Sequence, residues 1–329
     1  MKHTFIAVGL VLLLSAPLCA AERIRIGYSS ISGSYIGIWV AHDAGLFTKE
    51  GLEDQIILIP SGSQLAQVTV AGEVEVGFFN GSSAMAAAMQ GADIKIIGNT
   101  VNKMIFSLYT KPSIKTVEDL KGKKIGVTRF ASSTDISLRY ALRKHNVSEK
   151  DVTILQMGAI SSIMSGLQGG SIDGGVVSPP TLFAVEKLGF KELINITDLD
   201  LAFPNPSVVV QGGILRSQTQ FIDRFMRAYV RGMHRARTDK DLTIKSIARY
   251  SKIQDQFFLH KTYDLYVGKV LERTPAINMA GMKNALDDLA KTVSAAKDAK
   301  PEQFIDMGYL DRLEKSGLLK ELYPPPRAP

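Results

Sequence analysis

Residues 123–135 read KKIGVTRFASSTD, and this stretch contains the pattern that decides the fold. KKIGVT predicts a strand, RFASSTD reads as a polar loop, and ISLRYALRKHN directly after it predicts a helix. The same order continues through VTILQM and, after another helical stretch, GGVV at 174–177. Strands that alternate with helices, each strand ending in a Gly- or Ser-containing loop, are typical of an α/β unit with a largely parallel sheet.

An earlier part of the chain has the same organisation. RIRIGY predicts a strand, YSSISGSY a loop, and the stretch that begins at Ile36 a helix. Further strands are predicted at QIILIP, VEVGFF and DIKIIGNT, with helices between them. A chain of 329 residues is at the size where a single core usually divides in two. We therefore expect two α/β lobes.

The order of the predicted elements indicates one lobe inserted into the other. MIFSLYTK reads as a strand leaving the first lobe, and FPNPSVVVQGGIL as a crossover with a returning strand. Two hinges are expected, near Ser107–Ser113 and Phe203–Gln211. The predicted segments are a signal peptide (1–21), the first part of lobe 1 (22–110), the inserted lobe 2 (111–205), the mostly helical return to lobe 1 (206–322) and an extended Pro-rich tail (323–329).

The N-terminus has the features of a secretory signal. Lys2 precedes an apolar run, Phe5 to Leu14, which is too short to span a membrane and is followed by small residues. This pattern predicts cleavage after Ala21 and a periplasmic, soluble protein. A lipid anchor at Cys19 is disfavoured, because Leu18 replaces the expected small residue. A buried N-terminal helix is the other reading.

Composition disfavours several functions. Cys19 is the only cysteine, so the mature chain has no disulfide, no Cys-ligated metal and no thiol nucleophile. The four histidines beyond the signal are scattered, and no G-x-S-x-G motif is present. The net charge is +7, but the basic residues form no stripe with a nucleic-acid-reading motif. We expect no catalytic site, no metal, no cofactor and no nucleic-acid partner.

The loop that opens the helix after KKIGVT is the strongest candidate for ligand contact. Free N–H groups and the helix dipole make such a start an anion site, and Ser132, Ser133 and Thr134 add hydroxyl groups. Arg129 has the geometry for a bidentate pair with a carboxylate or sulfonate. Two other roles stay open: the hydroxyls cap the helix, and Arg129 pairs with Asp135 or Asp173.

Ligands of open α/β sheets bind beyond the carboxyl ends of the strands. Two lobes that face one another therefore place these loops around a common cleft, which hinge motion closes. The remaining candidates in these loops are Tyr35, Ser61, Ser63, Asn80, Ser82, Ser83, Ser178 and Pro179. For Asn80, Ser82 and Ser83 the alternative is helix capping with close backbone packing.

Four segments resemble substrate-binding proteins of ATP-driven importers: IRIGY…IWVAHDAGLFTKEGL, GADIKIIGN, TVEDLKGKKIGVTRFASSTD and GLQGGSIDGGVVSPP. The resemblance runs from about Arg23 to Ile214, and the most similar branch handles nitrate, aliphatic sulfonates, taurine and thiamine pyrimidine precursors. It implies a two-lobed, type II periplasmic-binding-protein-like fold, each lobe a mainly parallel sheet flanked by helices with the ligand cleft between the lobes.

The resemblance also implies a function. A monomer would capture a small polar or anionic molecule and deliver it to the membrane permease of an ABC importer. One alternative is an exported sensing module for a receptor. Another is an enzyme similar to the fungal pyrimidine synthase of the same family, which depends on a cysteine-rich iron motif that the mature chain lacks. The ligand stays open among nitrate, sulfonate, taurine, pyrimidine and carboxylate types, because a few loop side chains decide it.

Overall fold

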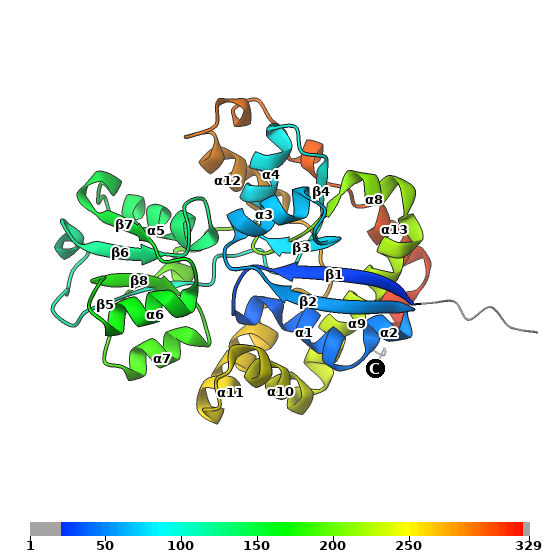
Figure 1. Cartoon of the computed structure of the whole chain (residues 1–329), viewed down its shortest axis with the longest axis horizontal. Coiled ribbons are helices and arrows are strands. Elements are labelled where there is room, and N and C mark those ends of the chain that lie inside the picture. The colour runs from blue at the N-terminus through cyan, green and yellow to red at the C-terminus, as the bar shows by residue number, and fades with distance from the viewer. Residues whose placement is uncertain (1–20, 325–329) are drawn as a thin grey trace, which may run out of the picture.

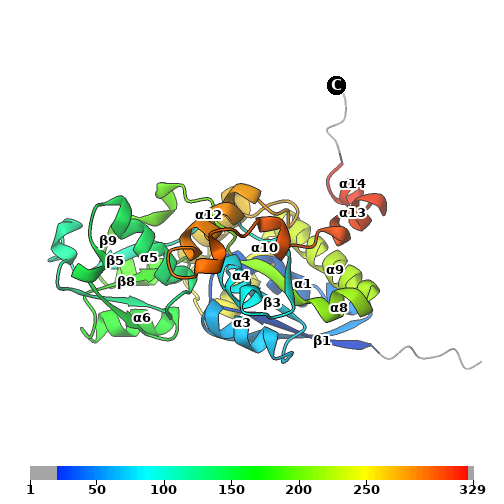
Figure 2. The same ribbon diagram turned by 90° about the horizontal axis from the view of Figure 1, so that it is seen from above.

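The computed structural model describes residues 21–324 as two lobes, each built on a five-stranded sheet flanked by helices (Figure 1). Seen from above, the two lobes lie side by side along the long axis of the molecule (Figure 2). The predicted signal peptide, except Ala21, and the last five residues of the predicted tail lie outside the described residues.

The first sheet has the strand order β2-β1-β3-β10-β4. β1, β2 and β3 pair in parallel, and β10 is antiparallel to both β3 and β4. Four strands thus share one direction, and the strand that returns from the second lobe opposes them. The strands are β1 (Glu22–Tyr28), β2 (Leu52–Leu58), β3 (Val76–Phe79), β4 (Ile94–Asn99) and β10 (Ser207–Gln211).

The second sheet repeats this arrangement in the order β7-β6-β8-β5-β9. β6 pairs in parallel with β7 and β8, and β5 is antiparallel to β8 and β9. β1 and β6, β3 and β8, and β10 and β5 therefore occupy equivalent places. The strands are β5 (Ser107–Thr110), β6 (Lys124–Val127), β7 (Thr153–Gln156), β8 (Gly174–Val177) and β9 (Lys191–Asn195).

The position of β5 corrects the predicted lobe boundary. We assigned residues up to 110 to the first lobe, but β5 pairs with β8 and β9 of the second sheet. The apolar pattern of a strand is the same whichever of the two sheets it joins. The pattern alone therefore could not assign β5 to the correct lobe. The chain crosses between the lobes before Ser107, earlier than the first predicted hinge, and again before Ser207, where the crossing overlaps the predicted hinge of Phe203–Gln211.

The two crossing segments run antiparallel beside one another. Lys103 and Ala202 form an isolated antiparallel bridge. The Phe203 N–H donates to the Asn102 carbonyl at 3.0 Å, and the Asn205 N–H donates to the Val101 carbonyl at 3.0 Å. These bonds join the crossings into a two-stranded hinge.

Helices cover both faces of each sheet. The glycine at position 45 divides the single helix predicted from Ile36 into two, because its φ of +63° is a conformation that glycine adopts freely. The second lobe has α5 (Ser133–Lys144), α6 (Ile160–Gln168) and α7 (Thr181–Lys187). The first lobe has α1 (Ile36–Asp43), α2 (Leu46–Lys49), α3 (Gly62–Val70), α4 (Gly81–Met89), α8 (Gly212–Ser217), α9 (Thr219–Thr238), α10 (Lys240–Ser251), α11 (Gln256–Leu265), α12 (Met279–Leu289), α13 (Gly308–Lys315) and α14 (Leu318–Leu322). Short 3-10 turns are η1 (Gly33–Tyr35), η2 (Glu118–Leu120), η3 (Glu149–Asp151), η4 (Ile196–Leu199), η6 (Ser294–Ala296) and η7 (Pro301–Phe304), and η5 (Tyr266–Val270) is a π-helical turn.

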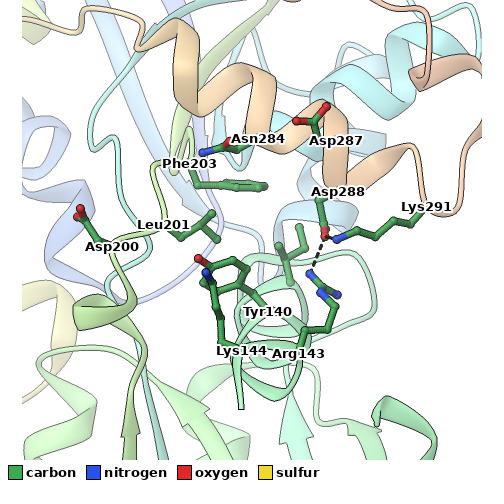
Figure 3. A pocket seen from close by; sticks show the side chains of 11 residues that line it. Tyr140, Arg143, Lys144, Asp200, Leu201, Phe203, Asn284, Asp287, Asp288 and Lys291 are labelled. Carbon is green, nitrogen blue, oxygen red and sulfur yellow. Dashed lines mark hydrogen bonds and ion pairs between the residues drawn. The ribbon is translucent and has the colours of Figure 1, made fainter. Parts of the chain in front are cut away.

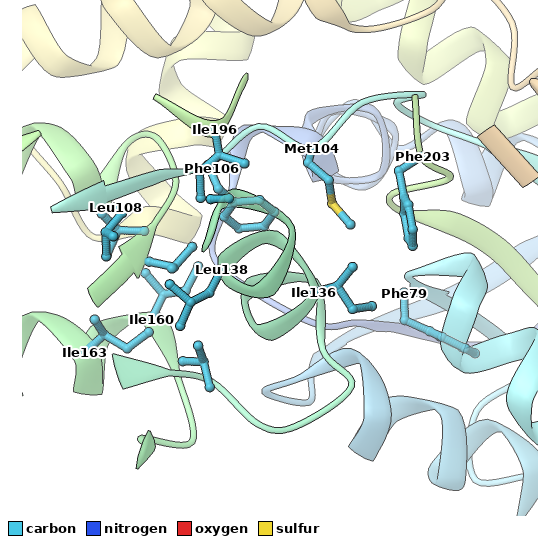
Figure 4. Close-up of a cluster of buried hydrophobic side chains, with 14 of the residues drawn as sticks. Phe79, Met104, Phe106, Leu108, Ile136, Leu138, Ile160, Ile163, Ile196 and Phe203 are labelled. Atoms are coloured by element: carbon cyan, nitrogen blue, oxygen red, sulfur yellow. The ribbon is translucent and has the colours of Figure 1, made fainter. Parts of the chain in front are cut away.

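One apolar core is continuous between the lobes. Met104 and Phe203 from the crossings meet Ile136 of the second lobe and Phe79 of the first, and each is 5% exposed or less (Figure 4). Full burial of such a side chain contributes about 1.5–3 kcal/mol. The hinge region is therefore filled by closely packed apolar side chains. A second core lies between the first sheet and α1 and α9.

Candidate functional site

The carboxyl ends of the parallel strands of both sheets meet at one cleft. After β1, β2 and β6 the chain enters loops rich in Ser and Thr, and these loops enclose a small polar chamber of about 20 Å³. That volume suffices for roughly one water molecule. The chamber is lined by Ser29, Ser30, Ser32, Ser34, Tyr35, Ser61, Gly62, Phe106, Thr128, Ser132, Ser133, Thr134, Ile160, Asn205 and Pro206.

Three buried hydroxyls form a triangle where β6 leads into α5. The Thr128 hydroxyl donates to Ser132 Oγ at 2.8 Å, and Thr134 Oγ1 lies 3.0 Å from both of these oxygens. Ser132 donates its own hydrogen to the Arg129 carbonyl at 2.6 Å, and Thr134 Oγ1 accepts the Thr128 N–H at 2.9 Å. Because the hydroxyl hydrogens of Thr128 and Ser132 are already used, the Thr134 hydroxyl hydrogen completes the triangle by donating to Thr128 Oγ1 or Ser132 Oγ.

The start of α5 offers unpaired backbone donors to the chamber. The N–H groups of Ser133, Thr134 and Asp135 have no acceptor within residues 21–324, because the first intrahelical bond of α5 is made by Ile136 to Ser132. The positive end of the helix dipole coincides with these donors. The chamber therefore favours a negatively charged or strongly accepting group, although no positively charged side chain lines it.

Backbone strain also gathers at the cleft. Ser61, at the start of α3, has a φ of +81°, and Ala131, in the loop before α5, has a φ of +60°. Such values cost non-glycine residues on the order of 1 kcal/mol or more and are concentrated at functional sites. The two strained residues come from opposite lobes, and both belong to loops that enclose the chamber.

Tyr35 presents a neutral hydroxyl to the polar chamber. Its hydroxyl oxygen lies 2.7 Å from Ser29 Oγ, and burial raises its pKa above the ordinary value of 10. Behind it the rings of Tyr28 and Trp39 form a tight aromatic group with Tyr250. The first lobe therefore supplies a rigid, uncharged wall.

Asn80 and Ser178 hold equivalent places, each directly after the third parallel strand of its lobe. Asn80 Oδ1 accepts the Ser83 N–H at 2.7 Å. Asn80 therefore caps α4, which is the alternative role that the sequence left open for it. Its Nδ2 atom and the Ser178 Oγ atom are both buried and make no hydrogen bond within residues 21–324. Buried polar atoms without a partner are uncommon, but neither residue lines the chamber.

Several contacts join the lobes across the cleft. The Gly33 N–H donates to the Pro179 carbonyl at 3.3 Å, and the Ser83 hydroxyl donates to the Ala131 carbonyl at 3.2 Å. The Ser133 hydroxyl donates to Asn205 Oδ1 in the hinge at 2.7 Å. These three bonds hold loops of the two lobes and the hinge against one another beside the chamber.

A second, largely apolar chamber of about 120 Å³ adjoins the first. The two chambers share Ser29, Ser30 and Ile160. The second lies between α6 and α7 of one lobe and the α10–α11 connection of the other. Its other lining residues are Ile31, Leu58, Pro60, Ala159, Ser161, Met164, Thr181, Ala184, Ser251 and Ile253.

A larger void, of about 360 Å³, lies between α5, α12 and the second crossing segment (Figure 3). Most of its charged groups are paired within the protein: Arg143 lies 2.8 Å from Asp288, which also lies 2.6 Å from Lys291. We therefore regard the cleft as the candidate ligand site and this void as a structural junction between the lobes.

The predicted site residues fall into three groups. Tyr35, Ser61, Ser132, Ser133 and Thr134 line the polar chamber, and Ser63 lies behind it with its Oγ 3.0 Å from that of Ser61. Asn80, Ser82, Ser83, Ser178 and Pro179 surround it without lining it.

Arg129 forms the third group. It is exposed, makes no ion pair with Asp135 or Asp173, and does not line the chamber. Burial raises the pKa of Asp135, which is paired instead with Arg139 at 2.9 Å.

Sequence reasoning missed the hinge residues Phe106, Asn205 and Pro206, the hydroxyls of Thr128 and the first loop, and the whole apolar chamber. The Asn between two prolines at 204–206 was a signal for the hinge contribution. Nothing in the helical sequence pointed to Ile253.

Within residues 21–324, no helix is long and apolar enough to cross a membrane. No group of three or more His, Cys, Asp or Glu side chains in the same part of the chain is arranged to hold a metal ion.

Two α/β lobes on a hinge, closed over a chamber at the strand ends, define the class of two-lobed solute-binding proteins. The chain belongs to the NMT1/THI5-like family, whose model matches residues 32–241. The alkanesulfonate-binding protein of Xanthomonas axonopodis pv. citri, solved bound to MOPS, has a TM-score of 0.70 with 20% identity and covers 84% of this chain and 95% of its own. That similarity establishes the fold.

Several curated relatives are named as binding proteins, with one enzyme as an exception. A protein of Brucella abortus (strain 2308) that is named as a binding protein is 27% identical over 233 residues, which cover 68% of this chain and 71% of the relative. The taurine-binding periplasmic protein of Escherichia coli (strain K12) is 32% identical over 135 residues, 39% of this chain and 40% of that protein. The exception is 4-amino-5-hydroxymethyl-2-methylpyrimidine phosphate synthase of Schizosaccharomyces pombe, 28% identical over 145 residues, 43% of this chain and 40% of the enzyme.

Proposed function

We propose that the chain is an extracytoplasmic solute-binding protein that captures a small molecule with a polar or anionic head and presents it to the permease of an ABC importer. The observation that supports this most directly is the closed polar chamber at the start of α5. Its free N–H groups, hydroxyls and helix dipole suit an oxygen-rich acceptor group, and the closed lobes exclude water and strengthen each hydrogen bond.

The proposal includes a periplasmic location and a non-catalytic role. The signal-like N-terminus and the periplasmic taurine-binding relative support the location. The absence of any cysteine after Cys19 speaks against the iron motif expected of the fungal synthase. Within the proposal the loop residues around the chamber, Ser132 to Thr134 foremost, contact the ligand head.

A thermal-shift panel tests the capture function. The chain from Ala21 onward is unfolded and refolded to remove bound ligand, then heated with nitrate, short sulfonates, taurine, pyrimidines and carboxylates, each near 1 mM. A ligand of about micromolar affinity adds roughly 4 kcal/mol of stability, which raises the melting temperature by several degrees. A saturable shift with one class is expected.

A matched pair of variants ties such a shift to the chamber. Ser133→Ala removes a hydroxyl that lines the chamber, whereas Ser165→Ala removes an exposed hydroxyl on α6. The first variant is expected to lose most of the shift and the second none. The absence of any shift across the panel, or equal shifts in both variants, contradicts the proposal.

A further inference from the structure

The apolar chamber continues the polar one into a region that the family model does not cover. Apart from Ser29, Ser30 and Ile31 at the end of β1, the lining residues of both chambers lie within 32–241, except Ser251 and Ile253. These two belong to the turn between α10 and α11, which we call the α10–α11 corner and define as residues 251–255. One wall of the site is therefore contributed by a part of this chain beyond the matched segment.

The α10–α11 corner is held firmly against the first lobe. Lys252 has a left-handed φ of +60°, which ends α10, and the Ser251 Oγ accepts the Ile253 N–H at 3.2 Å. Tyr250 stacks on Trp39 with a centroid distance of 5.0 Å and an interplanar angle of 7°. Arg249 anchors the end of α10 to Asp43 at 2.7 Å. The corner thus has a fixed position relative to the polar chamber.

The opposite wall of the apolar chamber belongs to the second lobe. Met164 comes from α6 and Ala184 from α7, and both are partly buried. Ile253 faces these helices across the chamber only while the lobes are closed. A non-polar group that reaches this space is therefore enclosed between two lobes, and its length decides whether they can meet.

We propose that the apolar chamber receives the non-polar end of the ligand and that Ile253, on the α10–α11 corner, sets the length of that end. The inference rests on the proposed function and narrows its ligand class to molecules with a compact polar head and a short apolar tail. Each methylene moved from water into the chamber strengthens binding about fourfold, until the tail meets the corner.

Two homologous series test the inference: straight-chain alkanesulfonates and straight-chain alkylcarboxylates, each from one carbon upward, titrated calorimetrically. Wild-type protein is expected to bind more tightly by about fourfold per methylene up to a limiting length, beyond which affinity falls. Ile253→Ala should move that limit to longer tails, and Ile253→Phe to shorter ones. The one-carbon compounds should bind all three proteins within about twofold, because the head does not reach the corner.

Val70→Ala is the matched control, since it shortens a β-branched residue that is 40% exposed on α3. Melting temperatures of all variants establish that they are folded. The inference is overturned if wild-type affinity does not depend on tail length, or if the limiting length is the same in wild type and both Ile253 variants. If the compounds still bind through their head groups in that case, the proposed function stands. Failure of every compound in both series and in the panel overturns both.

Discussion

Gly33 is the residue at which the binding loop leaves no room for a side chain. A Cβ atom there would lie 2.1 Å from Cδ2 of the fully buried Tyr266 ring. The ring cannot move freely, because the Tyr266 hydroxyl lies 2.9 Å from Ser32 Oγ in the same loop. The N–H of Gly33 also bridges to Pro179 of the other lobe. Any side chain at this position disturbs the loop and the lobe contact together.

We therefore expect Gly33→Ala to lower the free energy of unfolding by about 1–3 kcal/mol and to weaken ligand binding. Gly213→Ala is the comparison, because a Cβ there meets nothing within 4 Å and alanine favours the helix α8. Denaturant unfolding of both variants measures the difference. Equal stability of the two would show that the Tyr266 contact does not restrict position 33.

The sequence allowed candidate site residues to be predicted where they directly follow a predicted strand. Ser61, Ser132 and Thr134 were found because parallel strands direct their carboxyl ends to one cleft. Arg129 was misjudged: it follows a strand too, but its side chain is exposed, and sequence does not reveal which way a loop residue points. The position of Asn205 between two prolines was a local signal for its hinge contribution, whereas Ile253 reaches the site through tertiary packing alone and has no such signal.

At the scale of elements, α1 and β2 are joined by a charged pair. His42 Nδ1 lies 2.5 Å from Asp54 Oδ2, whose side chain is 7% exposed. The hydrogen bond to Asp54 raises the pKa of His42 above its ordinary value of 6.5, against a lowering by burial. A raised folded-state pKa means that the folded protein holds this proton more tightly than the unfolded chain does.

The sign of the pH dependence follows from that. The contribution of protonated His42 to the free energy of unfolding is fully present below pH 6.5. It is lost as the pH rises through the raised folded-state pKa. We expect it to be on the order of 0.5 kcal/mol. Unfolding free energies of wild type and His42→Gln, measured from pH 5.5 to 8.5, should converge as the pH rises. A constant gap between them would contradict the assignment.

Element boundaries show where sequence patterns reach their limit. The alternation of strands and helices was correct for both sheets, because buried strands and amphipathic helices have distinct periods. The sheet to which β5 belongs was predicted wrongly, because a strand such as SLYT fits either sheet. Only its pairing with Val176 and Ile194 decides between the two sheets. Lobe boundaries of this kind depend on long-range pairing.

At the scale of the whole molecule, closure is held at the cleft mouth by α7 and α11. The Phe183 and Phe258 rings stack across the lobes with centroids 5.7 Å apart. The Lys187–Asp255 ion pair beside them, at 3.2 Å, is largely exposed and adds little. An aromatic pair of this kind contributes about 0.5–1.5 kcal/mol, so it shifts the ratio of closed to open forms by roughly two- to twelvefold.

Phe258→Ala is therefore expected to raise the fraction of open molecules, and with it the radius of gyration in small-angle X-ray scattering. Phe257→Ala serves as the comparison, because Phe257 is 61% exposed and makes no contact with the Phe183 ring. The expected result is a larger radius for the first variant alone. Identical scattering from wild type and Phe258→Ala would mean that the stack does not hold the lobes together.

The interleaved strands have a consequence for biosynthesis. The second sheet is made from one uninterrupted stretch, β5 to β9, so it can be completed as soon as Asn195 has been synthesised. The first sheet cannot be completed at that point, because β10 lies between β3 and β4 and is the last strand to be synthesised. At translation rates of about 5–20 residues per second, the interval from Asn99 to Ser207 lasts about 5–20 s. Throughout that time the older half of the molecule has an unfilled gap in its sheet, so the lobe that begins first on the ribosome finishes last.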